Sequence, residues 1–346
     1  MRYPQFLKEN GSIGFVAPSF GCATEPYISA FKNAQKKLSQ KGHMLILGSN
    51  CYESRGVGIS NIPQLCGKEL NDMYCDSDAD ILISCGGGEL MCEILEYVDF
   101  KRIAQSEPKW YMGYSDNTNF TFLNTILCDT ATIYGPCAAA FGMEPWYENI
   151  KDCYELLRGR KLYQTGYDKW ESDSLKSEDN PLAPINATQP RVLRTYDENG
   201  KMTDRHLEFS GRLIGGCMDC LVNITGTKYD KTAEFIEKYK ADGIIWFLES
   251  CDLNVFSIRR AMWQMDNAGW FKYTKGFIIG RPMVHGQEMM GLDQYEAVMA
   301  VIRKYKVPVI MDADIGHIPP SMPVICGSYA EVNIKGQDFK INMILK

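Results

Sequence analysis

Two stretches of the sequence, ILISCGGGELMCEILEY at residues 81–97 and WYMGYSDNTNFTFLNTIL at residues 110–127, share one order of parts. Each begins with a short apolar run, continues through a glycine-containing turn and ends in a segment with helical periodicity. Because consecutive residues of each run are apolar, a strand formed there is buried on both faces, which is typical of parallel sheets covered by helices. The two stretches therefore predict an α/β fold built on a parallel sheet.

The same alternation extends over most of the chain and is interrupted once. In the first half we predict further strands at 13–17, 44–47 and 132–134 and helices at 27–38 and 62–74. A polar, proline-containing stretch follows at about 163–190. The alternation then resumes with strands at 207–214, 244–248, 276–279 and 309–311, helices at 255–267 and 292–304, and two strand-like pieces near the C-terminus. This arrangement predicts two α/β domains.

The N-terminal domain is predicted to cover residues 1–160 and to have a flavodoxin-like or glutamine-amidotransferase-like parallel sheet. The C-terminal α/β domain is predicted to be smaller and to cover residues 201–346. Residues 161–200 are predicted to form a linker and active-site loop, because so long an irregular segment is usually a linker or a functional lid. Trp170 and nearby apolar residues favour a loop that packs onto the protein.

Composition excludes several classes of protein. The formal net charge is -6 and no stretch is strongly basic, so nucleic acid is not expected as a partner. We expect neither a membrane-spanning segment nor a secretory signal peptide, and the 13 cysteines do not suggest a disulfide framework, so a cytoplasmic location is expected. The Cys217–Cys220 CxxC pair lacks a second pair at zinc-site spacing, which favours free thiols. No metal or cofactor is predicted.

Ser115 is the candidate nucleophile, in the sequence GYSDN at residues 113–117. It lies between a predicted strand and a predicted helix, where its hydroxyl is held at the sheet rim and the amide of Asp116 can donate to a developing oxyanion. The alternative is structural, since a serine followed by Asp116 and Asn117 also fits a helix N-cap.

The glycine run at 86–88 has three interpretations. It can be a structural turn, it can supply a second oxyanion donor, or it can hold phosphate, although the lysine and hydroxyl residue of a P-loop are missing. The phosphate interpretation makes the chain a nucleotide-binding α/β protein of a different enzyme class.

Glu249 ends a buried strand, where a carboxylate needs a partner. Orienting a histidine would suit a Ser-His-acid triad, and an ion pair with Arg259 or Arg260 is the alternative. Of the four histidines, His285 and His317 both follow predicted strands, and either one also fits a purely structural role.

Taken together, these motifs resemble the LD-carboxypeptidase and microcin-C-resistance family, the S66 serine peptidases. Each motif alone is weak, but their order along nearly the whole chain matches. The motifs are GFVAPS at 14–19, GG at 87–88, ILEYVD at 94–99, GYSD at 113–116, GRLIGG at 211–216, FLE at 247–249, GFIIG at 276–280 and GH at 316–317.

The resemblance implies a role for each matching residue. Ser115 would be the nucleophile, His317 the general base and acid, and Glu249 the residue that orients His317. The amides of Gly88 and Asp116 would form the oxyanion hole. The family also implies an active site between two domains, no metal and a homodimer.

Two branches of the family differ in substrate, and the long loop favours one. Murein LD-carboxypeptidases release terminal D-alanine from tetrapeptides. The microcin-resistance branch cleaves an amide in peptidyl or aminoacyl nucleotide analogues and has a longer loop with a tryptophan near the ligand. The loop with Trp170 favours the second branch, and Trp170 and Gly87 are predicted to contact a small peptide or peptidyl-nucleotide substrate. A non-catalytic protein that binds murein fragments or nucleotides is a further alternative.

This sequence departs from the family pattern at three positions. Cys217 replaces a frequent asparagine, Ser250 replaces an acidic residue after Glu249, and Glu89 follows the glycine pair where an aromatic residue or methionine is common. These departures bear on the substrate more than on the type of reaction.

Overall fold

The computed structural model describes residues 1–346, which divide into two compact units. Unit 1 comprises Met1–Lys161 and Asp173–Asn186, and unit 2 comprises Leu162–Ser172 and Ala187–Lys346. Parts of the segment predicted as a linker therefore belong to each unit. The predicted domain boundaries at residues 160 and 200 stay a prediction. None of the helices combines the length and the apolar character that a membrane crossing requires.

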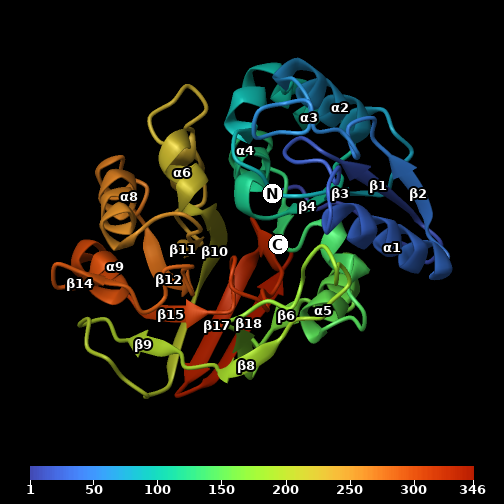
Figure 1. The fold of residues 1–346 in the computed structure, drawn as a ribbon. Helices are drawn as coiled ribbons and strands as arrows, with labels where there is room; N and C mark the ends of the chain where they lie inside the picture. Colours follow the sequence, from blue (N-terminus) through green and yellow to red (C-terminus); the bar gives the residue numbers. More distant parts are fainter. The chain divides into compact units, whose positions relative to one another are not determined.

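Unit 1 is built on a parallel sheet, as the apolar runs predict (Figure 1). Its five strands lie in the order β5-β4-β3-β1-β2, with bounds β1 Ser12–Val16, β2 Met44–Leu47, β3 Ile81–Ser84, β4 Trp110–Gly113 and β5 Thr132–Tyr134. Every residue of β1, β3, β4 and β5 is buried, whereas the edge strand β2 is partly exposed.

Helices cover both faces of this sheet. On one face, a single apolar core joins Val16 and Leu82 of the strands to Leu70 of α2, Ile94 of η1 and Phe120 of α4. On the other face, Phe31 of α1 packs edge-to-face on Phe15, with ring centroids 5.1 Å apart. The elements are α1 Tyr27–Gln40, α2 Pro63–Cys75, the 3-10 helix η1 Met91–Tyr97, α3 Phe100–Gln105, the 3-10 helix η2 Ser115–Asn117, α4 Thr118–Cys128, the 3-10 helix η3 Ala138–Gly142 and α5 Glu148–Leu157.

Unit 2 contains an eight-stranded mixed sheet in the order β6-β18-β17-β10-β11-β12-β15-β9. Its four central strands, β10 to β15 in that order, are parallel, and the outer strands are antiparallel. The strands are β6 Tyr163–Gln164, β9 Arg194–Tyr196, β10 Leu207–Cys217, β11 Ile244–Glu249, β12 Thr274–Gly280, β15 Val309–Ala313, β17 Tyr329–Lys335 and β18 Asp338–Ile344. A short strand, β16 Val324–Cys326, precedes β17.

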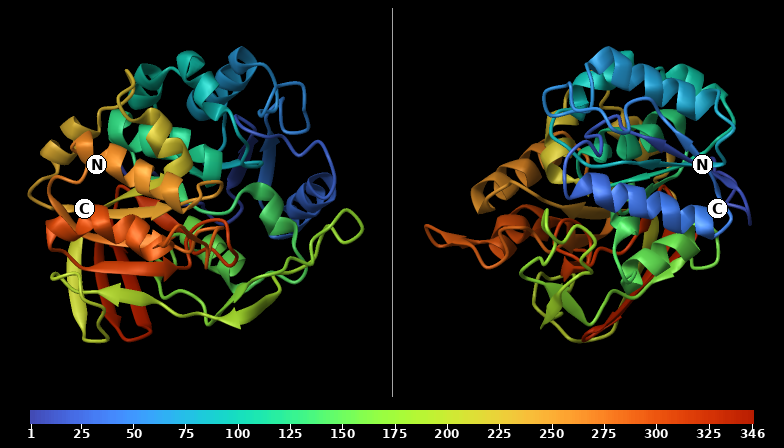
Figure 2. Two further views of the ribbon diagram at one scale, coloured as in Figure 1. Left: turned by 60° about the vertical axis from the view of Figure 1, so that its left-hand side comes forward. Right: turned by 45° about the vertical axis from the view of Figure 1, so that its right-hand side comes forward.

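Helices α6, α8 and α9 lie side by side along the parallel part of this sheet (Figures 1 and 2). The helices of unit 2 are α6 Met218–Ile224, α7 Thr232–Lys238, α8 Val255–Asn267, α9 Gln294–Ile302 and the 3-10 helix η4 Arg303–Tyr305. Two small antiparallel ladders stand apart from the main sheet, one between β7 Lys169–Glu171 and β8 Ala187–Pro190 and one between β13 Glu288–Met289 and β14 Leu292–Asp293.

The predicted α/β class is confirmed, with two local differences. The helix predicted over 89–97 is the 3-10 helix η1. The segment at 163–190, predicted to be irregular, contains β6, β7 and β8. Strands of two to four residues are too short to show a period of two, so these strands could not be recognised in a polar stretch of sequence.

Candidate active site

Ser115 occupies a sharp turn between β4 and α4. Its backbone φ is +62°, in the left-handed region that non-glycine residues adopt rarely and at an energetic cost. Its N–H donates to the Tyr134 hydroxyl at 3.1 Å. Ser115 is not a helix N-cap, because Tyr114 precedes η2 and Asn117 precedes α4. The N-cap positions therefore fall on other residues, and the strained turn at Ser115 has the geometry of a nucleophile elbow.

The glycine run lies directly against this elbow. A Cβ atom added to Gly87 would lie 3.3 Å from Cβ and 3.4 Å from Oγ of Ser115. A Cβ on Gly88 would come within 2.2 Å of Ser19 Oγ and 3.0 Å of the Gly58 carbonyl oxygen, so a side chain there would have to displace its neighbours. The side-chain amide of Asn117 donates to the Gly86 carbonyl at 2.9 Å and fastens the run to the turn. The run thus brings backbone close to the Ser115 hydroxyl, while the Gly88 amide as an oxyanion donor stays a prediction.

The Asp116 side chain has a structural role. Its carboxylate is 3% exposed and accepts hydrogen bonds from Ser19 Oγ at 2.6 Å, from the Met91 amide at 2.9 Å and from Asn119 Nδ2 at 3.0 Å. Burial raises the pKa of this carboxyl, and these hydrogen bonds partly oppose the rise. The carboxylate therefore locks the elbow to its neighbours, which leaves only the Asp116 amide for the predicted oxyanion hole.

In unit 2, Glu249 and His317 form a hydrogen-bonded pair. Glu249 is the last residue of β11 and is fully buried, and Nδ1 of His317 donates to its Oε2 at 2.8 Å. The His317 side chain keeps 12% of its surface exposed. The alternative partners that the sequence offered bond elsewhere: Arg259 donates to the Glu296 carbonyl and Arg260 to the Ser257 hydroxyl.

The electrostatics of this pair favour a protonated imidazole. Burial by itself lowers the pKa of His317, but the negative charge of Glu249 and hydrogen bonds with Cys251 and Glu249 outweigh it and raise the pKa well above its ordinary value. The arrangement stabilises an imidazolium, as the acid does in a Ser-His-acid triad. Sequence reasoning missed Cys251, since no local pattern links it to a histidine 66 positions later.

Cys217 lies beside the same pair. It is the last residue of β10 and stands directly opposite Glu249 in the parallel ladder between β10 and β11. The sulfur of Cys217, a carboxylate oxygen of Glu249 and a ring nitrogen of His317 all lie within 4.8 Å of one another. The departure from the family pattern noted at position 217 therefore falls at the centre of the candidate site.

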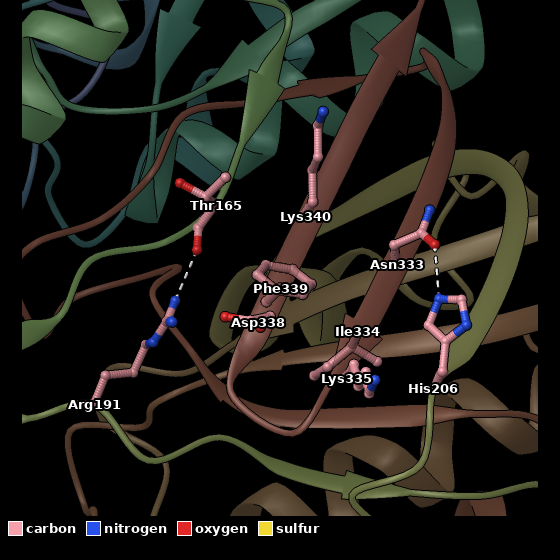
Figure 3. Close-up of a pocket in the computed structure, with 9 residues that line it drawn as sticks. All are labelled: Thr165, Arg191, His206, Asn333, Ile334, Lys335, Asp338, Phe339 and Lys340. Atoms are coloured by element: carbon pink, nitrogen blue, oxygen red, sulfur yellow. Dashed lines mark hydrogen bonds between the residues drawn. The ribbon is translucent and has the colours of Figure 1, made fainter.

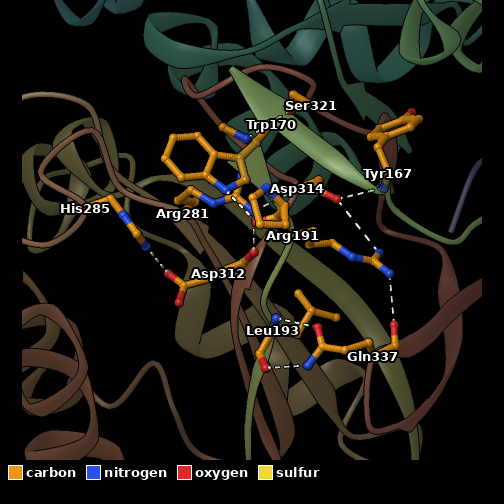
Figure 4. Close-up of polar contacts among 12 residues, drawn as sticks. Tyr167, Trp170, Arg191, Leu193, Arg281, His285, Asp312, Asp314, Ser321 and Gln337 are labelled. Carbon is orange, nitrogen blue, oxygen red and sulfur yellow. Dashed lines mark hydrogen bonds and ion pairs between the residues drawn. The ribbon is translucent and has the colours of Figure 1, made fainter. Parts of the chain in front are cut away.

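Trp170 belongs to a buried ionic cluster in unit 2 (Figure 4). Its indole ring covers the guanidinium of Arg281 at 4.9 Å and meets the His285 ring edge-to-face at 5.4 Å. Arg281 is 2% exposed and pairs with Asp314 at 3.1 Å, and the same carboxylate accepts the Tyr167 amide at 2.8 Å. The segment that carries Trp170 is thus held by charges at the end of β15.

A backbone hydrogen bond also joins the Trp170 strand to the His317 loop. The Glu171 amide donates to the Pro319 carbonyl at 2.7 Å, two residues beyond His317. Asp312, at the end of β15, has φ +61° and sits where the β12–β15 register shifts, which turns the chain toward this loop. The predicted substrate-binding tryptophan and the predicted catalytic histidine are therefore parts of one connected structure within unit 2.

The other three histidines have local partners. Nε2 of His43 lies 2.8 Å from the Tyr154 hydroxyl, and Nε2 of His206 lies 3.1 Å from Asn333 Oδ1. His285 lies 3.9 Å from Asp312 and not beside Glu249. Burial, the largest cause, lowers the pKa of His285. Of the candidates left open by the sequence, His317 is the one that pairs with Glu249.

A large open cavity lies elsewhere in unit 2. Its volume is about 630 Å³, and its wall includes Lys335 of β17, Lys340 of β18, and Arg191 and His206 from the segments that precede β9 and β10 (Figure 3). None of the predicted site residues lines it. Two of the side chains in its wall already have hydrogen-bond partners: Arg191 donates to the Thr165 carbonyl, and His206 contacts the Asn333 side chain. Cavity size alone does not locate the active site of this protein.

Two family models match the chain. The LD-carboxypeptidase N-terminal domain matches residues 13–135, and the LD-carboxypeptidase C-terminal domain matches residues 210–332. The chain belongs to the LD-carboxypeptidase family. The first match contains the Ser115 elbow, and the second contains Glu249 and His317.

Relatives and solved structures agree with this assignment. A protein of Vibrio cholerae that is provisionally named a carboxypeptidase is 25% identical over 99% of this chain and 98% of its own length. The microcin C7 self-immunity protein MccF, in an inactive mutant apo state, superposes with a TM-score of 0.82 at 21% identity, over 99% of this chain and 98% of its own. An MccF-like protein from Bacillus anthracis superposes with a TM-score of 0.82 at 20% identity over both full chains. These neighbours confirm the fold.

Two glycines next to Glu249 give a physical reason for the GH motif of this sequence. Gly316 has φ +114°, and a Cβ there would lie 2.6 Å from Glu249 Oε2. A Cβ on Gly280 would lie 2.8 Å from Glu249 Cβ and 2.1 Å from the Ile315 carbonyl oxygen. Both glycines therefore make room for the carboxylate–imidazole contact, which is a physical reason for glycine in two of the motifs found in the sequence.

We expect Gly316→Ala to displace the Glu249–His317 hydrogen bond. The variant should lose at least about tenfold in kcat/KM and about 1–3 kcal/mol in unfolding free energy, from backbone strain and the steric clash. Gly336→Ala is the matched control, because Gly336 also has positive φ but has open space around its Cβ position. Urea unfolding and steady-state kinetics measure both effects, and equal activity losses in the two variants would contradict a specific role for Gly316.

Proposed function

We propose that this member of the LD-carboxypeptidase family is a serine peptidase that hydrolyses a C-terminal amide bond through an acyl-enzyme on Ser115. The observation that carries the proposal is the buried 2.8 Å hydrogen bond between His317 and Glu249, in the second family match. The strained elbow at Ser115, in the first match, supports it independently. The proposal uses neither a metal nor a cofactor.

The proposed reaction has two steps. In the first, the Ser115 hydroxyl attacks the substrate carbonyl carbon and His317 accepts the hydroxyl proton, while Glu249 stabilises the imidazolium. Amides of Gly88 and Asp116 donate to the carbonyl oxygen as it becomes negative. The amide C–N bond then breaks and the amine leaves with the proton held by His317. In the second step, water repeats the attack, His317 again transfers the proton, and the acid product leaves Ser115.

This mechanism requires the Ser115 hydroxyl to come within hydrogen-bond reach of the His317 imidazole during catalysis. The two residues belong to different units and different family matches. A raised pKa means that His317 must lose a proton before it can act as a base. We therefore expect activity to rise with pH as His317 loses its proton.

We further propose that the substrate is an aminoacyl or peptidyl nucleotide analogue. The support is Trp170, whose ring is fixed by a hydrogen bond from Nε1 to the Pro190 carbonyl at 3.1 Å and by the Arg281 cation at 4.9 Å. A rigid aromatic ring is suited to stacking on a nucleobase. MccF has been solved in complex with aspartyl sulfamoyl adenosine and with glutamyl sulfamoyl guanosine, and an MccF-like protein from Streptococcus pneumoniae in complex with AMP. All three superpose on this fold.

Release of terminal D-alanine from a murein tetrapeptide is the second candidate. It rests on the family match itself, which names an LD-carboxypeptidase in both domains. The discriminating experiment incubates the purified chain in parallel with an aminoacyl sulfamoyl adenylate and with a murein tetrapeptide, and follows both products by liquid chromatography. Faster cleavage of the adenylate supports the proposal, faster release of D-alanine supports the second candidate, and no cleavage of either supports a non-catalytic binding protein.

Trp170 should matter for one substrate class only. We expect Trp170→Ala to raise KM for the sulfamoyl adenylate by about 5- to 150-fold, which corresponds to a stacking contribution of about 1–3 kcal/mol. Trp170→Phe should recover most of the loss, because a phenyl ring still stacks. Kinetics with the tetrapeptide provide the internal control, and an equal loss for both substrates would show that Trp170 only supports the His317 loop.

A further inference from the structure

Two thiols flank the Glu249–His317 pair, and the proposed mechanism uses neither of them. Cys217 faces Glu249 across the β10–β11 ladder, and Cys251 hydrogen-bonds the His317 imidazole. Cys217 is 1% exposed, and its sulfur donates to Asp219 Oδ2 at 3.3 Å. The amides of Cys251 and Asp252 donate to the same carboxylate at 3.0 and 2.8 Å. Asp219 therefore fixes the Cys217 thiol and the loop that carries Cys251 in place around the pair.

Cys217 and the Glu249–His317 pair together offer a set of ligand atoms that suits a metal ion. Cys217, Glu249 and His317 offer a sulfur, a carboxylate oxygen and an imidazole nitrogen, which are the three ligand types that zinc takes in proteins. Two of the residues are completely or almost completely buried, so this is not an exposed acidic patch. A thiolate, a carboxylate and a neutral imidazole carry two negative charges together, which balances one divalent cation in a buried site.

The spacing is close to what a cation requires. Three atoms that lie within 4.8 Å of one another share a point no more than about 2.8 Å from each, which is 4.8 Å divided by √3, whereas zinc bonds are about 2.0–2.3 Å long. Movements of less than an ångström in each side chain therefore complete the coordination. Three protein ligands leave a fourth position for water.

We propose that Cys217, Glu249 and His317 form an inhibitory binding site for a thiophilic divalent cation of the zinc class. The cation replaces protons, so that binding releases one proton from the Cys217 thiol and one from the imidazolium nitrogen that faces Glu249. Once coordinated, the Glu249 carboxylate no longer orients the imidazole and His317 no longer accepts the nucleophile's proton. The inhibition rests on the proposed function, whereas the binding does not.

The binding test uses no substrate. Isothermal titration calorimetry of the metal-free chain with Zn²⁺ alone should show one tight binding site. Cys217→Ser should weaken Zn²⁺ binding at least about tenfold, as loss of a zinc ligand does. Cys75→Ser is the matched control, since Cys75 is a half-buried free thiol in unit 1. Co²⁺ provides a spectroscopic check, because a thiolate-to-cobalt absorption band should appear in the parent and in Cys75→Ser and be absent from Cys217→Ser.

The inhibition test compares each variant with its own metal-free rate. Zn²⁺ should inhibit the parent and Cys75→Ser with the same midpoint, a chelator should restore activity, and Cys217→Ser should need at least about tenfold more Zn²⁺. Absence of Zn²⁺ binding, or equal binding by the parent and Cys217→Ser, overturns the site. Binding lost in Cys217→Ser without inhibition of the parent overturns the inhibitory role. A chain that binds Zn²⁺ at Cys217 but hydrolyses nothing keeps the site and refutes the proposed function instead.

Discussion

Replacing Ser115 with alanine is expected to lower kcat/KM by about 10³- to 10⁶-fold, the range seen when the nucleophile of a Ser-His-acid triad is removed. Alanine removes only Oγ, which forms the bond to the substrate carbonyl in the proposed mechanism. It leaves the Ser115 amide, which donates to Tyr134, in place. Substrate binding should change by no more than a few-fold, because the nucleophile contributes little to ground-state binding. Steady-state kinetics and calorimetry with intact substrate measure the two quantities.

The fold should survive this substitution. Alanine meets the same backbone requirement at φ +62° as serine does, so the unfolding midpoint in urea should hardly move. Ser29→Ala on α1 is the matched control and should keep the parent's activity, since Ser29 bonds only locally to Glu25. Full activity in Ser115→Ala would refute the nucleophile assignment. Inactivity together with a large loss of stability would instead indicate a structural role for the serine.

Replacing Glu249 with glutamine is expected to lower kcat by about 10²- to 10⁴-fold, because an amide can hold the imidazole in the wrong tautomer and cannot stabilise its cation. The substitution should also move the pH profile. In the parent, Glu249 helps to raise the pKa of His317 well above 6.5, so kcat/KM should rise with pH through a value above 6.5 as the base loses its proton. Without the carboxylate, burial lowers the pKa of His317, and this rise should move to lower pH.

The pH profile separates an electrostatic role from a merely structural one. Glu234→Gln on α7 is the matched control, because it removes an exposed carboxylate and should leave both kcat and the profile as they are in the parent. A Glu249→Gln variant that is slower but keeps the parent's pH profile would mean that the carboxylate does not set the charge of the catalytic base. A profile that moves to higher pH would contradict the account of the His317 pKa.

Much of the fold was predictable because the decisive signals are local. The buried strands of unit 1 are apolar at consecutive positions, and the helices between them are periodic, so both appear in a short window of sequence. The strands β17 and β18 were expected as two strand-like pieces, but the antiparallel pairing of the outer strands of unit 2 and the short β7–β8 ladder were not predictable in this way. Their pairing is a non-local property, and strands of two to four residues carry too little pattern.

The candidate site was predictable in parts. The Ser115 elbow has a local signature, since glycine and serine stand at a strand-to-helix turn. The choice of His317 over His285 came from the family resemblance. The local sequence around the two histidines does not show which of them pairs with Glu249. The Cys217–Glu249 contact depends on strand register, and the Cys251–His317 contact depends on loop geometry. Neither property can be predicted from a short stretch of sequence. The buried Arg281–Asp314 pair likewise joins residues 33 positions apart.

The most direct test of the nucleophile assignment is covalent labelling with an organophosphorus fluoride, followed by peptide mapping in a mass spectrometer. We predict that one equivalent of reagent abolishes hydrolysis and that the adduct lies on Ser115. Substrate should protect against labelling, and His317→Ala should slow it at least about a hundredfold, as expected when the general base is lost. An enzyme that is inactivated through another residue, or that stays fully active with Ser115 labelled, would contradict the account.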